Sequence, residues 1–123
     1  FETTCSGLGH ARTIARCRAA GWRGTLVFLY LDSLDIAVAR VARRVAMGGH
    51  AIPEDTVRRR YQAGLRNLLS IYLPQADAAW IHDNSLGLGT LIAHKTPEAG
   101  LVADSRLRWE QLNRHAHEKP DIR

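Results

Sequence analysis

The feature that most constrains the fold is an uninterrupted apolar run, TLVFLYL, at residues 25–31. A continuous apolar strand is typical of a parallel sheet, whose strands are buried on both faces because helices cover them. Asp32 and Ser33 end the run, and the Ser33 hydroxyl is suited to cap a helix that follows. The run therefore predicts a central strand of an α/β domain.

Hydrophobic spacing and turn residues place the other elements around this strand. We expect the end of a strand at 1–4, helices at 10–20 and 34–47, a long helix from 53 to 73, strands at 78–82 and 90–93, and a last helix at 104–115. This alternation predicts an α/β fold with a parallel sheet and helices on both faces. All 123 residues then form one domain with few strands, and we expect a further βαβ unit ahead of Phe1.

The composition excludes several classes of protein. With 46% hydrophobic and 24% charged residues the chain does not have the composition of a disordered protein. Two cysteines cannot support a disulfide scaffold, and no run is long and apolar enough to predict a membrane span. Cys5 and Cys17 are expected to be buried, reduced side chains of a cytoplasmic protein.

The net charge of +5 is carried by arginines in the first half of the chain. Seven arginines lie between Arg40 and Arg66, and only Glu54 and Asp55 offset them. Guanidinium groups form paired hydrogen bonds with phosphate and carboxylate, so the cluster favours an anionic ligand.

The helices at 34–47 and 53–73 are joined by a short Gly-Gly-His loop, so they are predicted to form a hairpin over residues 34–73. Because a short connection makes its arms neighbours, their arginines can converge on a phosphoryl group during its transfer. The arginines concerned are Arg40, Arg43, Arg44, Arg58, Arg59 and Arg60. The spacing favours a mobile phosphate-binding lid, with a solvated basic face and a nucleic-acid surface as alternatives.

Polar residues at the expected N-terminal strand end form a second candidate site. Glu2, Thr3 and Thr4 lie where α/β sheets bind ligands, at the carboxyl end of a strand. Hydroxyl side chains also stabilise turns and cap helices, and this is the simpler interpretation.

Other motifs are weak or absent. Gly7 and Gly9 form a G-x-G, but Arg12 occupies the third glycine position of a dinucleotide fingerprint. The phosphate loop G-x-x-x-x-G-K-[ST] does not occur. His115 and His117 are expected to be surface residues near the end of the chain.

Several segments resemble the middle of the zeta toxin family of P-loop kinases, and in particular its short bacterial branch of predicted ATPases. They are FETTCSG at 1–7, LYL at 29–31, RVARRVAMGGHAIPE at 40–54, VRRRY at 57–61, LRNL at 65–68 and DNS at 83–85. The run at 40–61, which contains RV, GGH, P and RRY, is specific because it fixes glycines, a proline and arginines together. The family's Walker A segment, Mg²⁺ ligands and catalytic carboxylate would lie ahead of Phe1.

This resemblance implies a P-loop NTPase-like fold and a kinase that uses ATP or GTP with Mg²⁺. The γ-phosphoryl group would pass to a hydroxyl of a small molecule, such as UDP-N-acetylglucosamine, and an antitoxin protein would be a partner. The residues carried over are Arg44 and Arg59 as catalytic, Arg40, Arg60, Asn84 and Ser85 as nucleotide-binding, and Glu2, Thr3 and Thr4 as substrate-binding.

Two alternatives to the kinase stay open: a basic binding module without catalysis, and an inactive remnant. No aromatic residue is interleaved among the arginines at 40–60, which disfavours a nucleic-acid partner that stacks its bases. A half sheet with an open edge tends to pair, so a homo-oligomer is a further expectation.

Overall fold

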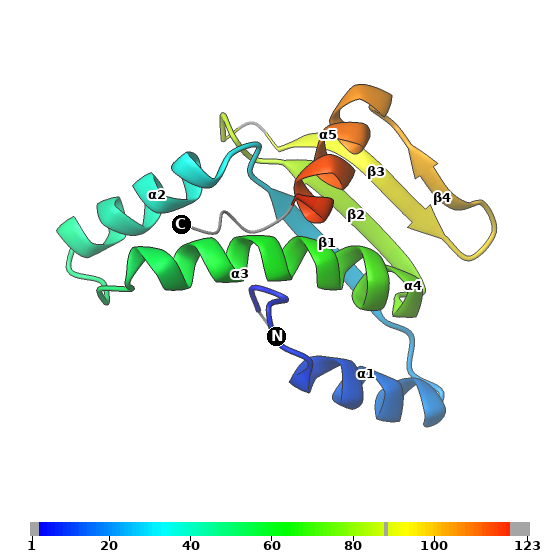
Figure 1. The fold of residues 1–123 in the computed structure, drawn as a ribbon. Helices are drawn as coiled ribbons and strands as arrows, with labels where there is room; N and C mark the ends of the chain where they lie inside the picture. The colour runs from blue at the N-terminus through cyan, green and yellow to red at the C-terminus, as the bar shows by residue number, and fades with distance from the viewer. Residues whose placement is uncertain (1–2, 88, 119–123) are drawn as a thin grey trace.

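The computed structural model describes residues 3–87 and 89–118. Its elements, drawn in Figure 1, are α1 (Gly9–Ala19), β1 (Thr25–Tyr30), α2 (Leu34–Ala46), α3 (Glu54–Asn67), the π-helical turn η1 (Leu68–Tyr72), α4 (Leu73–Gln75), β2 (Ala78–Asp83), β3 (Thr90–Thr96), β4 (Gly100–Ala103) and α5 (Arg106–His117). The helices and most of the strands lie within a few residues of their predicted bounds. The expected strand end at 1–4 is wrong for Thr3 and Thr4, which belong to no strand. Phe1 and Glu2 lie outside the described residues.

The four strands form one mixed sheet in the order β1-β2-β3-β4. Only β1 and β2 are parallel, because α2, α3 and the turns after them carry the chain back to the start of the sheet. The β2–β3 and β3–β4 pairs are antiparallel and are joined by short connections. The fold is therefore α/β. The predicted parallel pairing is present between β1 and β2 but is wrong for the other two pairs of described strands, and β4 was not predicted.

The hydrophobic core lies between one face of this sheet and the helices α3 and α5. Tyr30, Ala79 and Ile81 point from the strands toward Leu65 and Leu68 of the α3 segment. Leu112 and Ala116 of α5 complete the cluster, and their exposed fractions are at most 1%. Figure 1 views the sheet from the side that α3 and α5 cover. Since α1 and α2 contain no buried residue, the core is formed by the sheet, the α3 segment and α5.

The opposite face of the sheet is exposed. Val27, Trp80, His94 and Val102 are register partners on the four successive strands, so their side chains form one row across this face. Val27 is 60% exposed and Trp80 is 39% exposed. The row contains no Lys, Arg, Asp or Glu, although sheet faces in water usually carry such residues. The prediction that helices bury β1 on both faces is therefore wrong for the described part of the chain.

Helix capping and close packing account for several local features. The Ser33 hydroxyl accepts a hydrogen bond from the backbone N–H of Ile36 at 3.2 Å, as expected of an N-cap, and Ser105 caps α5 in the same way. A Cβ atom on Gly64 would lie 2.5 Å from the carbonyl oxygen of Thr4, so only glycine lets the segment before α1 pack on α3. Pro74 was expected to close the long helix, but the helical path continues to Gln75.

The two cysteines differ in their surroundings. Cys5 is buried, and burial raises the pKa of its thiol, whereas Cys17 is exposed. The prediction was therefore wrong for Cys17, because α1 packs too loosely to cover it. Among the described residues, no helix combines the length and apolar composition that a membrane span requires.

Candidate phosphate-binding hollow

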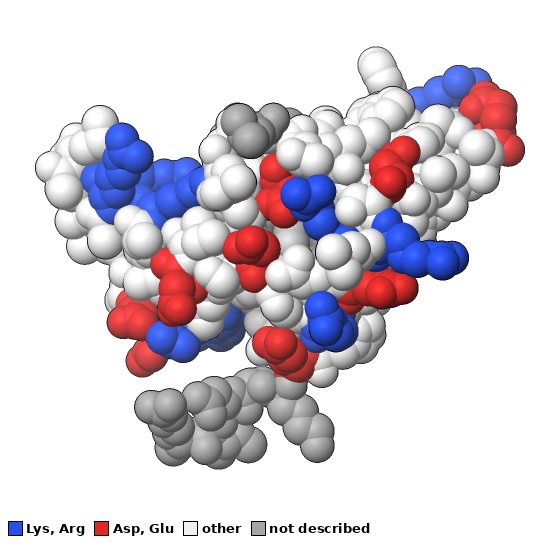
Figure 2. Space-filling model, turned by 90° about the horizontal axis from the view of Figure 1, so that it is seen from above, with Lys and Arg blue, Asp and Glu red and all other residues white. Residues whose placement is uncertain are grey.

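The predicted hairpin is present: α2 and α3 run side by side and project beyond the sheet (Figure 1). Gly48 has φ of +95° and permits the turn after α2. A Cβ atom on Gly49 would lie 2.9 Å from the carbonyl oxygen of Arg44, which explains a second glycine there. Figure 2 shows basic and acidic side chains side by side on the hairpin end of the molecule.

A hollow of about 1220 Å³ lies between this hairpin, β1 and α1. Three of the predicted arginines, Arg40, Arg44 and Arg60, line it, and so do Thr3 and Thr4. The structure thus places arginines from both arms of the hairpin around the same space as the hydroxyl residues of the N-terminal segment. Such a surface can bind an anion through charge and hydrogen bonds.

Arg40 is already engaged by the protein. Its guanidinium donates to the carbonyl oxygens of Asn84 at 2.5 Å and of Ser85 at 3.2 Å. These bonds attach α2 to the loop that follows β2. Arg40 therefore has a structural role as well as a place in the hollow.

The loop at 83–85 is also held by internal bonds. The Ser85 hydroxyl donates to the Asp83 carboxylate at 2.5 Å and accepts from the backbone N–H of Asp32 at 2.9 Å. Arg108 of α5 forms an ion pair with the same carboxylate at 3.3 Å. Asn84 lines the hollow, whereas Ser85 does not appear among its lining residues. These contacts connect the carboxyl ends of β1 and β2.

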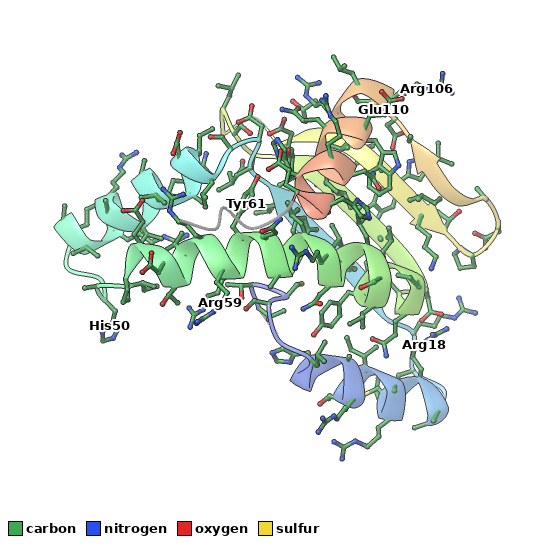
Figure 3. The ribbon with its side chains drawn as sticks, viewed as in Figure 1. Arg18, His50, Arg59, Tyr61, Arg106 and Glu110 are labelled. Atoms are coloured by element: carbon green, nitrogen blue, oxygen red, sulfur yellow. The ribbon has the colours of Figure 1, made fainter. Side chains whose placement is uncertain are left out.

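The remaining arginines of the hairpin fall into two groups. Arg44 and Arg60 line the hollow, and both are exposed. Arg59 is exposed but is not among the lining residues, and Figure 3 shows it on the side of α3 away from α2. Arg58 pairs with Glu54 of the same helix at 2.7 Å. Consecutive arginines on a helix point in different directions, so the three at 58–60 cannot act together.

The threonines before α1 form bonds typical of a turn. The Thr3 hydroxyl accepts from the backbone N–H of Cys5 at 3.1 Å, and the hydroxyls of Thr4 and Ser6 lie 2.7 Å apart. Cys5 itself has φ of +61°, a value uncommon outside glycine. The threonines thus form a turn, which was the simpler of the two sequence interpretations. Thr3 and Thr4 also line the hollow. The third residue of this set, Glu2, lies outside the described residues.

A cluster that the sequence did not predict adjoins the hollow, which its members Tyr30 and Tyr61 line. The Tyr30 hydroxyl is 2.7 Å from His115 Nδ1, and the Tyr61 hydroxyl donates to the Leu31 carbonyl oxygen at 2.6 Å. Tyr61 is also 3.4 Å from the same histidine nitrogen. Burial raises the pKa of both tyrosines. His115 was expected at the surface, but it is half-buried, and no local pattern around it indicates a partner 85 residues earlier.

The described residues contain no group of three or more His, Cys, Asp or Glu side chains that could hold a metal ion. Comparisons with protein-family models, with curated proteins and with solved structures found no match for this chain. The interpretation of the site therefore depends on its own geometry and on the sequence resemblance described above.

Proposed function

We propose that this chain is the phosphate-binding lid portion of a zeta-toxin-like, P-loop small-molecule kinase. The observation that carries the proposal is that Arg44 and Arg60, from the two arms of one hairpin, line the same hollow. Neither side chain has an ion pair among those found in the described residues, whereas Arg58 is paired with Glu54. Both guanidiniums are therefore available to an anion.

Arginine is well suited to this task. Its planar guanidinium binds two phosphate oxygens at once and remains charged at any physiological pH. In phosphoryl transfer the negative charge spreads over the outer oxygens, and groups fixed around them stabilise that charge. Two arginines on a projecting hairpin fit such a role, with Arg40 holding the base of the hairpin to the 83–85 loop.

The proposed reaction transfers the γ-phosphoryl group of ATP or GTP to a hydroxyl group of a small molecule. The resemblance suggests a nucleotide sugar such as UDP-N-acetylglucosamine as that molecule. The hydroxyl oxygen forms a bond to the γ-phosphorus, and the bond from phosphorus to the bridging oxygen breaks. The nucleoside diphosphate leaves, and the hydroxyl proton passes to a base that we do not assign to the described residues. These residues offer no cluster suited to Mg²⁺, so no step is assigned to that ion.

The proposal is tested by calorimetric titration of the chain with pyrophosphate and with ATP. We expect Arg44→Ala combined with Arg60→Ala to weaken pyrophosphate binding by roughly a hundredfold or more, because each charge-assisted hydrogen bond contributes about 1.5–3 kcal/mol. Arg43→Ala combined with Arg58→Ala is the matched control. It removes the same charge from the same two helices, at positions that do not line the hollow.

Equal losses in the two double variants would mean that only net charge matters, and the proposal would then be wrong. Absence of pyrophosphate binding by the unmodified chain would also contradict it. Binding of duplex DNA with a steep salt dependence, in place of pyrophosphate, would support the basic binding module instead.

A further inference from the structure

Helix α1 and the turn after it carry positive charge that the proposed function does not use. Residues 9–24 contain four arginines and a histidine but no aspartate or glutamate. The helix has no buried residue and lies at the periphery of the molecule, away from α5 and β4 (Figure 1). Arg18 forms an ion pair with Asp77 at 3.1 Å, whereas no ion pair is found for Arg12 or Arg16 among the described residues.

Arg12 and Arg16 lie on the outer face of α1. They are four residues apart, so their side chains are neighbours, with about 5–6 Å between the Cβ atoms. Ile14 and Cys17, on the opposite side of the helix, line the hollow, and the two arginines do not. A further strand of the same protein beside β1 would occupy the hollow and would leave this outer face accessible. Two adjacent, exposed guanidiniums suit the successive phosphates of one strand.

A tryptophan is held in water directly after α1. Gly21 has φ of +94°, and its backbone N–H donates to the carbonyl oxygen of Arg18 at 3.0 Å. The N–H of Trp22 donates to the carbonyl oxygen of Cys17 at 3.0 Å, so the two bonds form a Schellman motif that fixes the chain at this point. Trp22 is nevertheless 71% exposed, between Arg18 and Arg23 in the sequence. A fixed, exposed indole ring among arginines is a surface on which a planar ring can stack.

We infer that α1 and Trp22 bind a single-stranded nucleic acid. Arg12 and Arg16 bind phosphates of its backbone, and the indole ring of Trp22 stacks on a base. The hairpin has no aromatic residue among its arginines at 40–60, which disfavours such a partner there, but α1 has one at its end. This inference does not depend on the proposed function, since Arg12 and Arg16 do not line the hollow.

Two other anionic partners fit this surface less well. A lipid surface requires a broad apolar face beside the basic one, but the larger apolar side chains of α1, Ile14 and Cys17, line the hollow. In a duplex the bases are paired and stacked on one another, so Trp22 has no base to stack on. A strand with free bases is the partner that uses both the arginines and the indole ring.

The experiment follows the fluorescence anisotropy of a labelled oligothymidylate of about ten nucleotides, within the range of known single-strand sites. We expect saturable binding that weakens with salt, with a slope of log K against log[salt] of about −1.4 for two phosphates. Arg12→Ala combined with Arg16→Ala should remove most of this slope and weaken binding tenfold or more at about 50 mM salt. Arg43→Ala combined with Arg58→Ala removes the same charge from the hairpin and should leave the affinity within about twofold.

The stacking contact is tested separately. Trp22→Ala should weaken binding roughly tenfold without changing the salt slope, because one base loses its stacking surface. Trp22→Phe should retain most of the affinity, since a phenyl ring still offers a face to the base. An abasic strand of the same length should bind the unmodified chain about as weakly as oligothymidylate binds Trp22→Ala.

Equal losses in the two double-arginine variants would mean that only net charge matters, and would overturn the inference. So would equal binding of oligothymidylate and the abasic strand, tighter binding of a duplex, or binding of phosphatidylserine vesicles without binding of the oligonucleotide. Arg12→Ala with Arg16→Ala retains Arg44 and Arg60, so its pyrophosphate titration should match that of the unmodified chain. That titration separates failure of this inference from failure of the proposed function.

Discussion

The hydroxyl of Tyr30 lies 2.7 Å from Nδ1 of His115, across 85 residues of sequence. This contact joins the edge strand β1 to the last helix, α5, next to Tyr61 of the hairpin. Helices and sheet therefore meet at a polar cluster inside an otherwise apolar core, and the cluster gives the first two predictions.

Tyr30→Phe should destabilise the fold by about 1–2 kcal/mol, because it removes the hydrogen bond and leaves the buried side of His115 with only the longer contact to Tyr61. Urea unfolding followed by circular dichroism measures the change. Tyr61→Phe provides a comparison, since it removes a different bond, to the Leu31 carbonyl. Unchanged stability of Tyr30→Phe would show that the Tyr30–His115 contact contributes little.

Stability should fall as the pH rises above about 10. Burial raises the pKa of Tyr30 and Tyr61 in the folded chain, whereas both titrate near 10 when unfolded. Their neutral forms therefore favour the folded state fully below pH 10, and this contribution is lost as the unfolded tyrosines ionise. Urea unfolding between pH 8 and pH 11 should show a shallower decline for Tyr30→Phe with Tyr61→Phe than for the unmodified chain.

Arg40→Ala should cost about 1–3 kcal/mol of stability, because its guanidinium donates to two carbonyl oxygens of the 83–85 loop. Arg44→Ala, one turn later on the same helix, should change stability by less than about 0.5 kcal/mol. Thermal unfolding of the two variants separates them. A similar loss in both would mean that helix charge, and not the loop contact, determines the effect.

Arg59→Ala distinguishes the sequence resemblance from the observed geometry. The resemblance assigns a catalytic role to Arg59, whereas Arg60 is the residue of this pair that lines the hollow. We expect Arg60→Ala to weaken pyrophosphate binding by roughly tenfold and Arg59→Ala by less than about twofold. Calorimetric titration of the two single variants makes the comparison, and the reverse order would restore the assignment from the resemblance.

The apolar run at 25–31 was sufficient to predict β1, because seven consecutive apolar residues leave few alternatives. It could not show what covers the strand, since that depends on segments distant in the sequence. The predicted second helical layer is absent from the described residues, and Val27 and Leu29 are exposed as a result. Strand β4 was missed because its four residues are few and show no alternation of apolar and polar side chains.

The arginine hairpin was predictable for a similar reason: the Gly48-Gly49 turn and the arginine spacing are local. The different contacts that the individual arginines make were not predictable from the sequence. Arg40 is engaged by carbonyl groups 44 and 45 residues later, and no feature near Arg40 indicates this. Tyr30 and His115 are a second example, because a hydrogen bond between side chains far apart in sequence leaves no periodic pattern.

The row of side chains from Val27 to Val102 contains an intrinsic fluorophore, the indole ring of Trp80. Trp80 lies in the middle of that row, 39% exposed and stacked on His94 with ring centroids 5.4 Å apart. Indole fluorescence shifts to shorter wavelength when water is removed from around the ring. A molecule that binds this face of the sheet therefore changes the emission of Trp80, and no added label is needed. With Trp22 replaced by phenylalanine, the signal arises from Trp80 and from the half-buried Trp109, which lies on the helical side of the sheet.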